Sequence, residues 1–315
     1  MTAFLVAIRI KHKSKTATSM KKKYIRPLPI VLAAALVSSV APLSASSLLL
    51  NFHTTHANDP GVVAGDYLDL SPGHATNSIP SGETTWNNFN TLTPGSSLSK
   101  SDGTAATGAV VSFGREGTPG NGIISYSATN INTTALYGTG GGASGIENYL
   151  SNAGSIYGDG NNTLNSAPGR TGWLGGAGDT AIGLRVDGLL AGSYSIFVMG
   201  RNTNSTASGA AMTFFASAGE ISPNYDFSAL TGSVTSPSIV AQPDPTAYNE
   251  FIAGDNYTML NVTIADGQSL YLASDGSGNE TRGFLNMLQI VPIPEPSTAL
   301  LSVCGVFALL RRRRA

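Results

Sequence analysis

The side chains best suited to chemistry form a short oxygen-rich run late in the sequence. Oxygen atoms recur at alternate positions there, in Asp275, Ser277, Asn279 and Glu280. Because Ca²⁺ takes several oxygen ligands from a tight turn, this run predicts a calcium site, and no other cofactor is expected. The run lacks the acid at the third position and the glycine at the sixth position of an EF-hand loop, so a plain surface turn is the alternative.

The two tryptophans are candidates for carbohydrate binding. Trp86 has amide side chains close by in the sequence, and Trp173 lies among glycines. An indole ring can stack on a sugar while neighbouring polar groups bind its hydroxyls, so each tryptophan predicts a stacking platform. The alternative for each is a place in the hydrophobic core.

Motifs for catalysis are missing from the sequence. His53 and His56 have a spacing that suits one metal ion, but without a His-Glu-x-x-His motif they are typical of a solvated linker. The sequence has no Gly-x-Ser-x-Gly elbow, and the only cysteine is Cys304. A glycosidase needs two carboxylates across a cleft, whereas five glutamates have contexts typical of solvated surface: Glu83, Glu116, Glu147, Glu220 and Glu250. We therefore predict no catalytic residue and no enzymatic activity.

The elements that position these side chains are predicted to be strands. Apolar residues alternate with polar ones or glycine in 182–186 and 194–198, which indicates half-buried strands. Further strands are expected at 110–113, 123–127, 212–217, 238–241, 248–252, 257–264, 269–273 and 284–291. Turns are expected at 266–267 and 275–278, and one short helix at 145–152. The pattern predicts an all-β body, an antiparallel β-sandwich or jelly roll.

Charge is distributed unevenly along the chain. Residues 46–292 hold 18 acidic and six basic residues, a net charge of -12. Lys100 is the only lysine in this span. A surface of this charge cannot neutralise a phosphate backbone, so nucleic acid is excluded as a partner.

The N-terminal segment has the features of an export signal. A basic run, Lys21 to Arg26, precedes the apolar stretch 30–37, and small residues follow around Ser46. We expect residues 1–46 to act as a signal peptide with a short helical core, cleaved between about 41 and 47. An uncleaved membrane anchor is the alternative, although the apolar stretch is shorter than the ~20 residues that a span needs. Because Met20 precedes the lysines, residues 1–19 could lie upstream of the true start.

The C-terminal segment 293–315 has three parts in a fixed order. A Pro-Glu-Pro motif comes first, an apolar stretch at 298–310 follows, and a cluster of arginines comes last. The residues of the motif and the cluster are Pro294, Glu295, Pro296, Arg311, Arg312, Arg313 and Arg314. Prolines hold the motif extended, and the arginines would stay cytoplasmic while the body lies outside. The apolar stretch would form a short helix of about 20 Å, less than the ~30 Å hydrocarbon core. The alternative is a buried terminal helix with a basic cap.

This segment resembles the PEP-CTERM sorting signal of Gram-negative bacteria that make extracellular polysaccharide. The resemblance implies recognition by an exosortase, a membrane transpeptidase that cuts near the motif. It also implies transient anchoring in the inner membrane, followed by transfer to the cell surface or the extracellular space. The body, 47–292, resembles galactose-binding-like jelly rolls in its strand, glycine-bearing turn and strand at 185–198 and in its closing strand at 283–291.

Three hypotheses for the function follow. The first is a non-enzymatic cell-surface or matrix protein that associates with exopolysaccharide. The second is a carbohydrate-binding module that uses Trp86 or Trp173. The third is a polysaccharide-active enzyme, a lyase or hydrolase, with a carboxylate or calcium site that the sequence does not reveal.

Overall fold

The computed structural model describes the strands of the body and the segments around them. The described residues are 46–52, 71–89, 97–126, 173–174, 180–200, 210–229, 234–235, 239–240, 251, 253–254, 257–278 and 281–294. All of them belong to one compact unit, Ser44–Ala315. The expected helix at 145–152 lies outside these ranges, as do the N-terminal signal and the tail beyond Pro294. Within these ranges no helix has the length and apolar character needed to cross a membrane.

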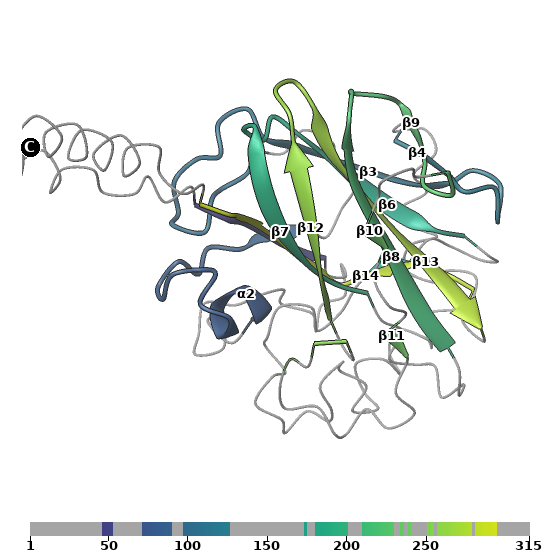
Figure 1. Ribbon diagram of the computed structural model, residues 1–315, viewed down its shortest axis with the longest axis horizontal. Helices are drawn as coiled ribbons and strands as arrows, with labels where there is room; N and C mark the ends of the chain where they lie inside the picture. The colour runs from purple at the N-terminus through teal and green to yellow at the C-terminus, as the bar shows by residue number, and fades with distance from the viewer. Residues whose placement is uncertain are drawn as a thin grey trace, which may run out of the picture. The chain divides into compact units, whose positions relative to one another are not determined.

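The body is all-β, as predicted, and its strands form two main sheets (Figure 1). The five-stranded sheet has the order β12 (Thr258–Ile264), β7 (Gly192–Met199), β15 (Met287–Pro292), β1 (Leu48–Phe52) and β2 (Asn87–Phe89). The eight-stranded sheet has the order β10 (Val234–Thr235), β8 (Ala210–Gly219), β13 (Ser269–Gly278), β6 (Ile182–Asp187), β3 (Val110–Glu116), β4 (Ile123–Ser125) and β9 (Asn224–Asp226), and β11 (Ile239–Val240) also pairs with β8.

A third, two-stranded sheet pairs β14 (Phe284–Leu285) with β5 (Trp173–Leu174), and one short helix, α2, spans Pro72–Ala75. Neighbouring strands in the three sheets are antiparallel in every described pair except β1 with β2. The antiparallel β-sandwich is therefore confirmed, while the finer jelly-roll connectivity stays a prediction.

Burial along the strands explains why they form. Along β12, Leu260, Val262 and Ile264 are buried, whereas the residues between them are exposed. This period of two is the pattern of a strand with one face in the core. By contrast, β1 is buried at all five positions, because both faces of the five-stranded sheet are covered there.

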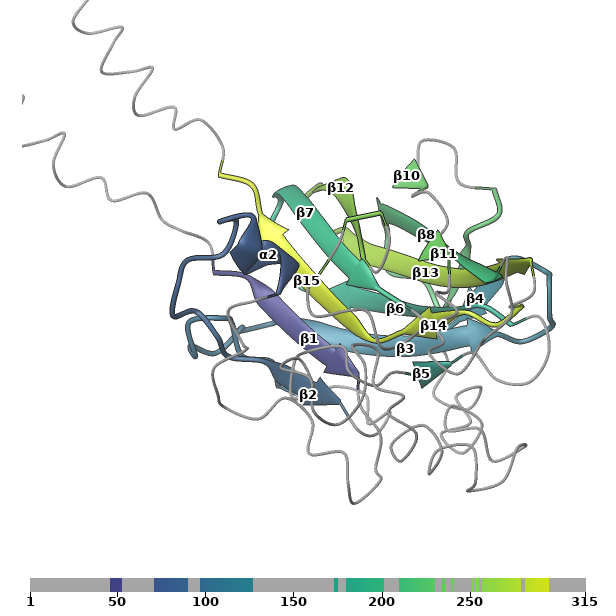
Figure 2. The ribbon, with the colours of Figure 1, turned by 90° about the horizontal axis from the view of Figure 1, so that it is seen from below.

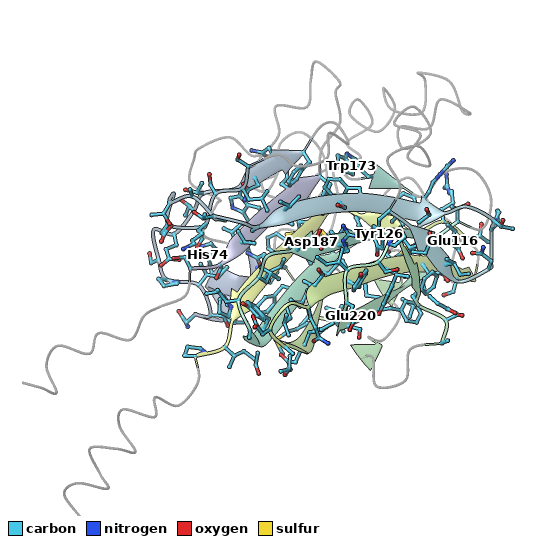
Figure 3. All side chains as sticks on the ribbon, turned by 90° about the horizontal axis from the view of Figure 1, so that it is seen from above. His74, Glu116, Tyr126, Trp173, Asp187 and Glu220 are labelled. Carbon is cyan, nitrogen blue, oxygen red and sulfur yellow. The ribbon has the colours of Figure 1, made fainter. Side chains whose placement is uncertain are left out.

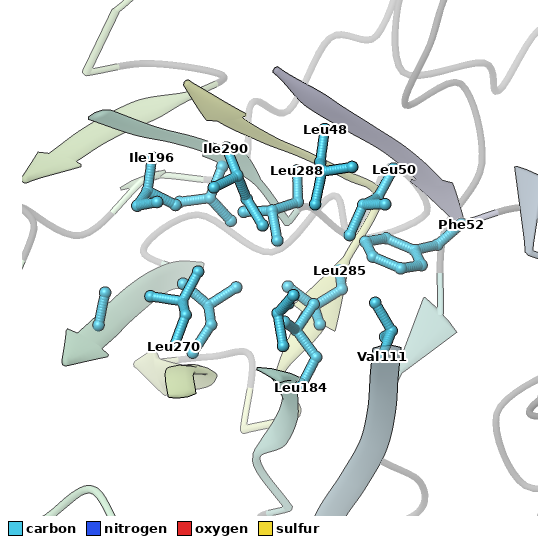
Figure 4. Packing of buried hydrophobic residues seen from close by; sticks show 14 of the residues in the cluster. Leu48, Leu50, Phe52, Val111, Leu184, Ile196, Leu270, Leu285, Leu288 and Ile290 are labelled. Atoms are coloured by element: carbon cyan, nitrogen blue, oxygen red, sulfur yellow. The ribbon is translucent and has the colours of Figure 1, made fainter. Parts of the chain in front are cut away.

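The main core lies between the two large sheets. Figure 4 shows Leu48, Leu50 and Ile290 of the five-stranded sheet facing Leu184 and Leu270 of the eight-stranded sheet. All five side chains are at most 4 % exposed. Burying a leucine or isoleucine contributes roughly 1.5–3 kcal/mol, so this contact between the sheets is the main source of stability.

The outer face of each sheet has a smaller core of its own. On the five-stranded sheet, Ile79 and Trp86 pack over Leu49, Phe197 and Met287. The eight-stranded sheet curls at the β4–β9 edge, where three buried aromatic side chains gather: Tyr126, Phe227 and Tyr271.

A pair of glycines makes the curl of the eight-stranded sheet possible. Gly114 of β3 and Gly183 of β6 are direct partners in the sheet. A Cβ at Gly183 would lie 2.7 Å from the Leu272 carbonyl oxygen and 3.1 Å from Cγ2 of Ile124. The absent Cβ atoms leave the space that Ile124 fills, so β4 can fold over the sheet.

Two segments differ from their sequence predictions. The strand expected at 284–291 is divided into β14 and β15, which belong to different sheets. The segment 275–278 is not a turn, because it forms the second part of β13. Asp275 pairs with Thr213, and Gly278 pairs with Ala210. The ten-residue strand β8 provides hydrogen-bonding partners along this whole length, which outweighs the local turn preference of aspartate and glycine.

Candidate functional site

The described body begins and ends at the same end of the sandwich. We call this region the termini end and define it as residues 46–48, 188–193 and 292–294. The start of β1 and the last part of β15 lie side by side there (Figure 2), with Leu48 opposite Ile290. Partner residues in adjacent antiparallel strands are ~4.5–5.5 Å apart, so the two chain ends leave the body close together.

The C-terminal side of the termini end is formed by the last residues of β15 and by Ile293 and Pro294. After β15, the Ile293 amide still donates a hydrogen bond to the Ser193 carbonyl at 2.8 Å. The Ile293 side chain is 40 % exposed, and Pro294 is exposed as well. The described fold thus ends at the first residue of the Pro-Glu-Pro motif.

The N-terminal side of the termini end is held by polar contacts. Ser47 and Ser101 exchange two hydrogen bonds, from the Ser47 amide to Ser101 Oγ at 3.1 Å and from the Ser101 amide to the Ser47 carbonyl at 2.8 Å. The Ser46 hydroxyl donates to Asp102 Oδ2. This bond, with further bonds from Thr104, lowers the pKa of Asp102 from 3.8 to about 2.

The remaining predicted sorting residues lie outside the described residues. They are Glu295, Pro296, Arg311, Arg312, Arg313 and Arg314. The signal segment 1–45 also lies outside, and so do His53 and His56. Their predicted roles stay predictions.

The structure places Trp173 in the core, which corrects its prediction as a sugar platform. Trp173 is 0 % exposed, and its ring packs against Phe52 and Phe113 at centroid distances of 5.3 and 4.9 Å. A stacking platform needs an open ring face, and this ring has none. The flanking glycines suggested a surface loop, but Trp173 forms β5 with Leu174 instead.

Trp86 is also buried, with 9 % of its surface exposed. It belongs to the small core over the outer face of the five-stranded sheet, beside Ile79 and Tyr257. Its Nε1 atom is buried and has no hydrogen-bond partner among the described residues. Both tryptophans therefore lie in the hydrophobic core, which was the alternative to a role in carbohydrate binding.

The predicted calcium ligands are only partly described. Asp275 and Ser277 lie in β13, and Ser277 Oγ is 3.5 Å from the Ala211 carbonyl of β8. Asn279 and Glu280 lie outside the described residues. An extended strand does not wrap its side chains around an ion as a tight turn does. Among the described residues, no three His, Cys, Asp or Glu side chains are grouped so that they could hold a metal ion.

The described glutamates differ in environment. Glu116 is 3 % exposed, and its carboxylate accepts hydrogen bonds from the amides of Gly122 at 2.6 Å and Ala181 at 2.8 Å. Glu83 accepts a hydrogen bond from the Ser101 hydroxyl at 2.6 Å. Glu220 is exposed, as predicted. The buried Glu116 serves the backbone and cannot reach a substrate, while Glu147 and Glu250 lie outside the described residues.

Sequence reasoning missed a buried polar network around α2. His74 Nδ1 lies 2.7 Å from Ser71 Oγ, and its Nε2 lies 3.1 Å from the Glu83 carbonyl. Because that carbonyl can only accept, Nε2 carries the proton and the Ser71 hydroxyl donates to Nδ1. Gln289 of β15 donates to Ser71 Oγ and accepts from the Gly73 amide. Ser71 is fully buried, and this serine and histidine join α2 to the sheet.

A second cluster, also missed, lies on the curled face of the eight-stranded sheet. Arg185 and Asp187 form a bidentate ion pair, in which two guanidinium nitrogens lie 2.8 and 2.9 Å from the two carboxylate oxygens. The Arg185 guanidinium also donates to the Ser222 carbonyl and lies 5.7 Å from the Tyr126 ring centre. Figure 3 shows Tyr126 and Asp187 on this sheet, well away from His74.

Two stacked tyrosines complete this cluster. Tyr225 lies on Tyr271 at 4.4 Å with nearly parallel rings. Burial raises the pKa of Tyr225 to about 12 and raises that of Tyr126 well above 10.0. Arg185 and Tyr271 both bind the backbone next to Ile221, so the cluster holds the segment after β8 against the sheet. The signal in the sequence was Arg185, a charged residue within the apolar alternation of 182–186.

Comparison of the chain with protein-family models, with curated proteins and with solved structures found no match.

Proposed function

We propose that this chain is an exported, non-enzymatic cell-surface or matrix protein that an exosortase-type system sorts through its C-terminal segment. In this proposal the signal peptide directs export, the apolar stretch 298–310 holds the body at the outer face of the inner membrane, and the transpeptidase cuts near Pro294–Pro296. The body then reaches the cell surface, where exopolysaccharide is its proposed partner.

One observation supports this proposal above all others. Strand β15 ends at Pro292, and the chain is exposed at Ile293 and Pro294, where the motif begins. A transpeptidase binds its substrate as an extended segment, which prolines favour. A cut after Pro294 therefore removes no strand from the body, so the released protein keeps its fold.

The carbohydrate-binding form of the hypothesis needs a different surface from the one first predicted, because both tryptophans are buried. The outer face of β7 and β12 carries exposed hydroxyl and amide groups in cross-strand pairs. Ser193 pairs with Thr263 at 3.2 Å, and Ser195 pairs with Asn261 at 3.1 Å. These groups are the ones with which exopolysaccharide would form hydrogen bonds in this proposal.

The test is a sorting experiment in a Gram-negative host that carries an exosortase. Cells express the full chain or the Glu295→Ala variant, and the inner-membrane, periplasmic, outer-membrane and medium fractions are analysed by intact mass. The wild-type chain is expected at the surface or in the medium, shortened at both ends. The Glu295→Ala chain is expected to accumulate in the inner membrane with its tail intact.

Glu220→Ala is the matched control, because it removes an exposed glutamate that lies outside the motif, 75 residues before Glu295 in the sequence. This variant should be sorted like the wild type. A wild-type chain that keeps its arginines and stays in the cytoplasmic fraction would contradict the proposal.

A further inference from the structure

Two exposed apolar side chains lie at the termini end. Leu190, in the turn between β6 and β7, is 76 % exposed, and Ile293 is 40 % exposed. They are among only five large apolar side chains that the described residues expose. Exposed apolar residues that gather at one place mark an interaction site more often than scattered ones do.

The local structure holds Leu190 outward. The neighbouring Leu189 packs against the main core, so the two leucines point in different directions. The Tyr194 hydroxyl donates a hydrogen bond to the Leu190 carbonyl at 2.7 Å, and Gly188 has the positive φ of 75° that the turn requires. Leu190 is therefore presented on a fixed turn.

Leu190 and Ile293 belong to neighbouring strand ends. The Ile293 amide binds the Ser193 carbonyl, and Pro292 is the sheet partner of Tyr194. The turn that carries Leu190 directly precedes this part of β7. Both side chains therefore lie where the chain leaves the body toward its C-terminal segment.

The sequence after Pro294 limits how far the termini end can lie from a membrane. Three residues, Glu295 to Ser297, separate Pro294 from the apolar stretch 298–310. From Pro294 to the first apolar-stretch residue, an extended chain reaches about 14 Å at ~3.3–3.6 Å per residue. The headgroup layer on each side of a bilayer is roughly 5–8 Å thick. A short apolar stretch would draw the body closer still, since it covers about 20 Å of the ~30 Å hydrocarbon core.

From this geometry we infer that the termini end is a membrane-contact surface, with Leu190 and Ile293 inserted among the lipid headgroups while the C-terminal segment is anchored. The inference rests on the proposed function, because it needs the tail in the bilayer. The partner is the outer surface of the inner membrane. The predicted signal segment leaves from the same end, so before its removal it would hold the same surface to the membrane.

The contact depends on the tail and is apolar in nature. The body carries a net charge of -12 in residues 46–292, so anionic lipids repel it. Two apolar side chains alone give weak binding, because the apolar surface that they bury is small. Cleavage of the tail therefore also ends the membrane contact, which favours release of the body.

The test places a fluorescent label at one cysteine at a time in the full chain. The native Cys304 reports the tail, and in a Cys304→Ser background Leu190→Cys reports the termini end. Met259→Cys is the matched control, because Met259 is 50 % exposed and lies five residues along β12 from Ile264, about 17 Å from the termini end. The proteins are reconstituted into vesicles of phosphatidylethanolamine and phosphatidylglycerol that carry nitroxide quenchers at the headgroup or in the acyl chain.

The label at position 190 is expected to lose most of its fluorescence to the headgroup quencher, while the label at 259 keeps its fluorescence. The Cys304 label should be quenched from the acyl chain. If Cys304 is quenched but positions 190 and 259 behave alike, the membrane-contact surface is wrong and the proposed function stands. If Cys304 is not quenched, the anchored tail is wrong, and the inference fails with it. Circular dichroism of each variant verifies the fold.

Discussion

Glu116 connects two loops, because its carboxylate accepts hydrogen bonds from the amide of Gly122, six residues further along the chain, and from the amide of Ala181, 65 residues further along. Replacement by alanine leaves both amides buried without an acceptor. The Glu116→Ala variant should lose about 3 kcal/mol of unfolding free energy, since each unsatisfied buried group costs ~1–3 kcal/mol. Urea unfolding at neutral pH measures the loss.

The exposed Glu220 provides the control for this prediction. Glu220→Ala removes the same side chain from the surface and should change stability by less than ~0.5 kcal/mol. Equal stability of the Glu116→Ala and Glu220→Ala variants would contradict the structural role of Glu116.

Asp102, near the N-terminal end of the described body, contributes to the free energy of unfolding in a way that depends on pH. Its folded-state pKa of about 2 lies below the ordinary 3.8, and the Ser46 hydroxyl is the main cause. This stabilisation of the fold is therefore present above pH ~4 and is lost as the pH falls toward ~2. As the pH falls, Asp102 takes up a proton in the unfolded chain at a higher pH than in the folded chain. NMR titration should show the Asp102 pKa rising toward 3.8 in Ser46→Ala. An unchanged pKa in that variant would rule out the Ser46 hydrogen bond as the cause.

Individual side chains were the hardest part to predict from the sequence. Trp173 lies among glycines, which indicate a loop locally, yet its burial depends on Phe52 and Phe113, which are distant in sequence. The same holds for Glu116, whose polar context suggested the surface. Glu220 was predicted correctly, because the described residues leave it exposed. The local sequence pattern thus misses burial that distant segments create.

At the scale of elements, the curl of the eight-stranded sheet depends on the facing glycines of β3 and β6. Gly183→Ala would place a methyl group against the Leu272 carbonyl and Ile124. We expect a loss of about 1–3 kcal/mol, the usual cost of overpacking, measured by thermal and urea unfolding.

Gly219→Ala is the matched substitution in β8, which lies two strands from β6 in the same sheet. A Cβ there would meet only the Tyr271 ring at 3.5 Å, an ordinary contact. Stability should be unchanged or slightly higher, because alanine restricts the unfolded chain more than glycine does. Comparable destabilisation by both substitutions would show that the space around Gly183 has no special role.

Strands with one buried face were predictable, and strands with two buried faces were not. The alternation in 182–186 and 194–198 gave the positions of β6 and β7 to within a few residues, and the strand expected at 257–264 is β12. The first strand, β1, reads Leu-Leu-Leu-Asn-Phe and has no alternation, so the sequence did not predict it. The second part of β13 was predicted as a turn because aspartate and glycine favour turns locally. In both cases partner strands far away in sequence determine the structure.

At the scale of the whole molecule, β15 joins the two halves of the five-stranded sheet. It lies between β7 and β1, and β1 comes first in the chain. A chain that ends after Pro294 keeps β15 and should unfold cooperatively in urea, like the full body. A chain that ends after Asn286 lacks β15 and should show no cooperative transition, because β12 and β7 lose their connection to β1 and β2. Cooperative unfolding of the shorter chain would contradict this central role of β15.

The neighbouring positions of β1 and β15 also determine how the body responds to mechanical load. A force that pulls Ser46 and Pro294 apart acts first on the Leu48 and Ile290 pair and then opens the two strands one residue pair after another, like a zipper. Each step breaks few hydrogen bonds, so little force is needed. A body that is held only through its C-terminal segment avoids this load, because no tension then crosses the pair.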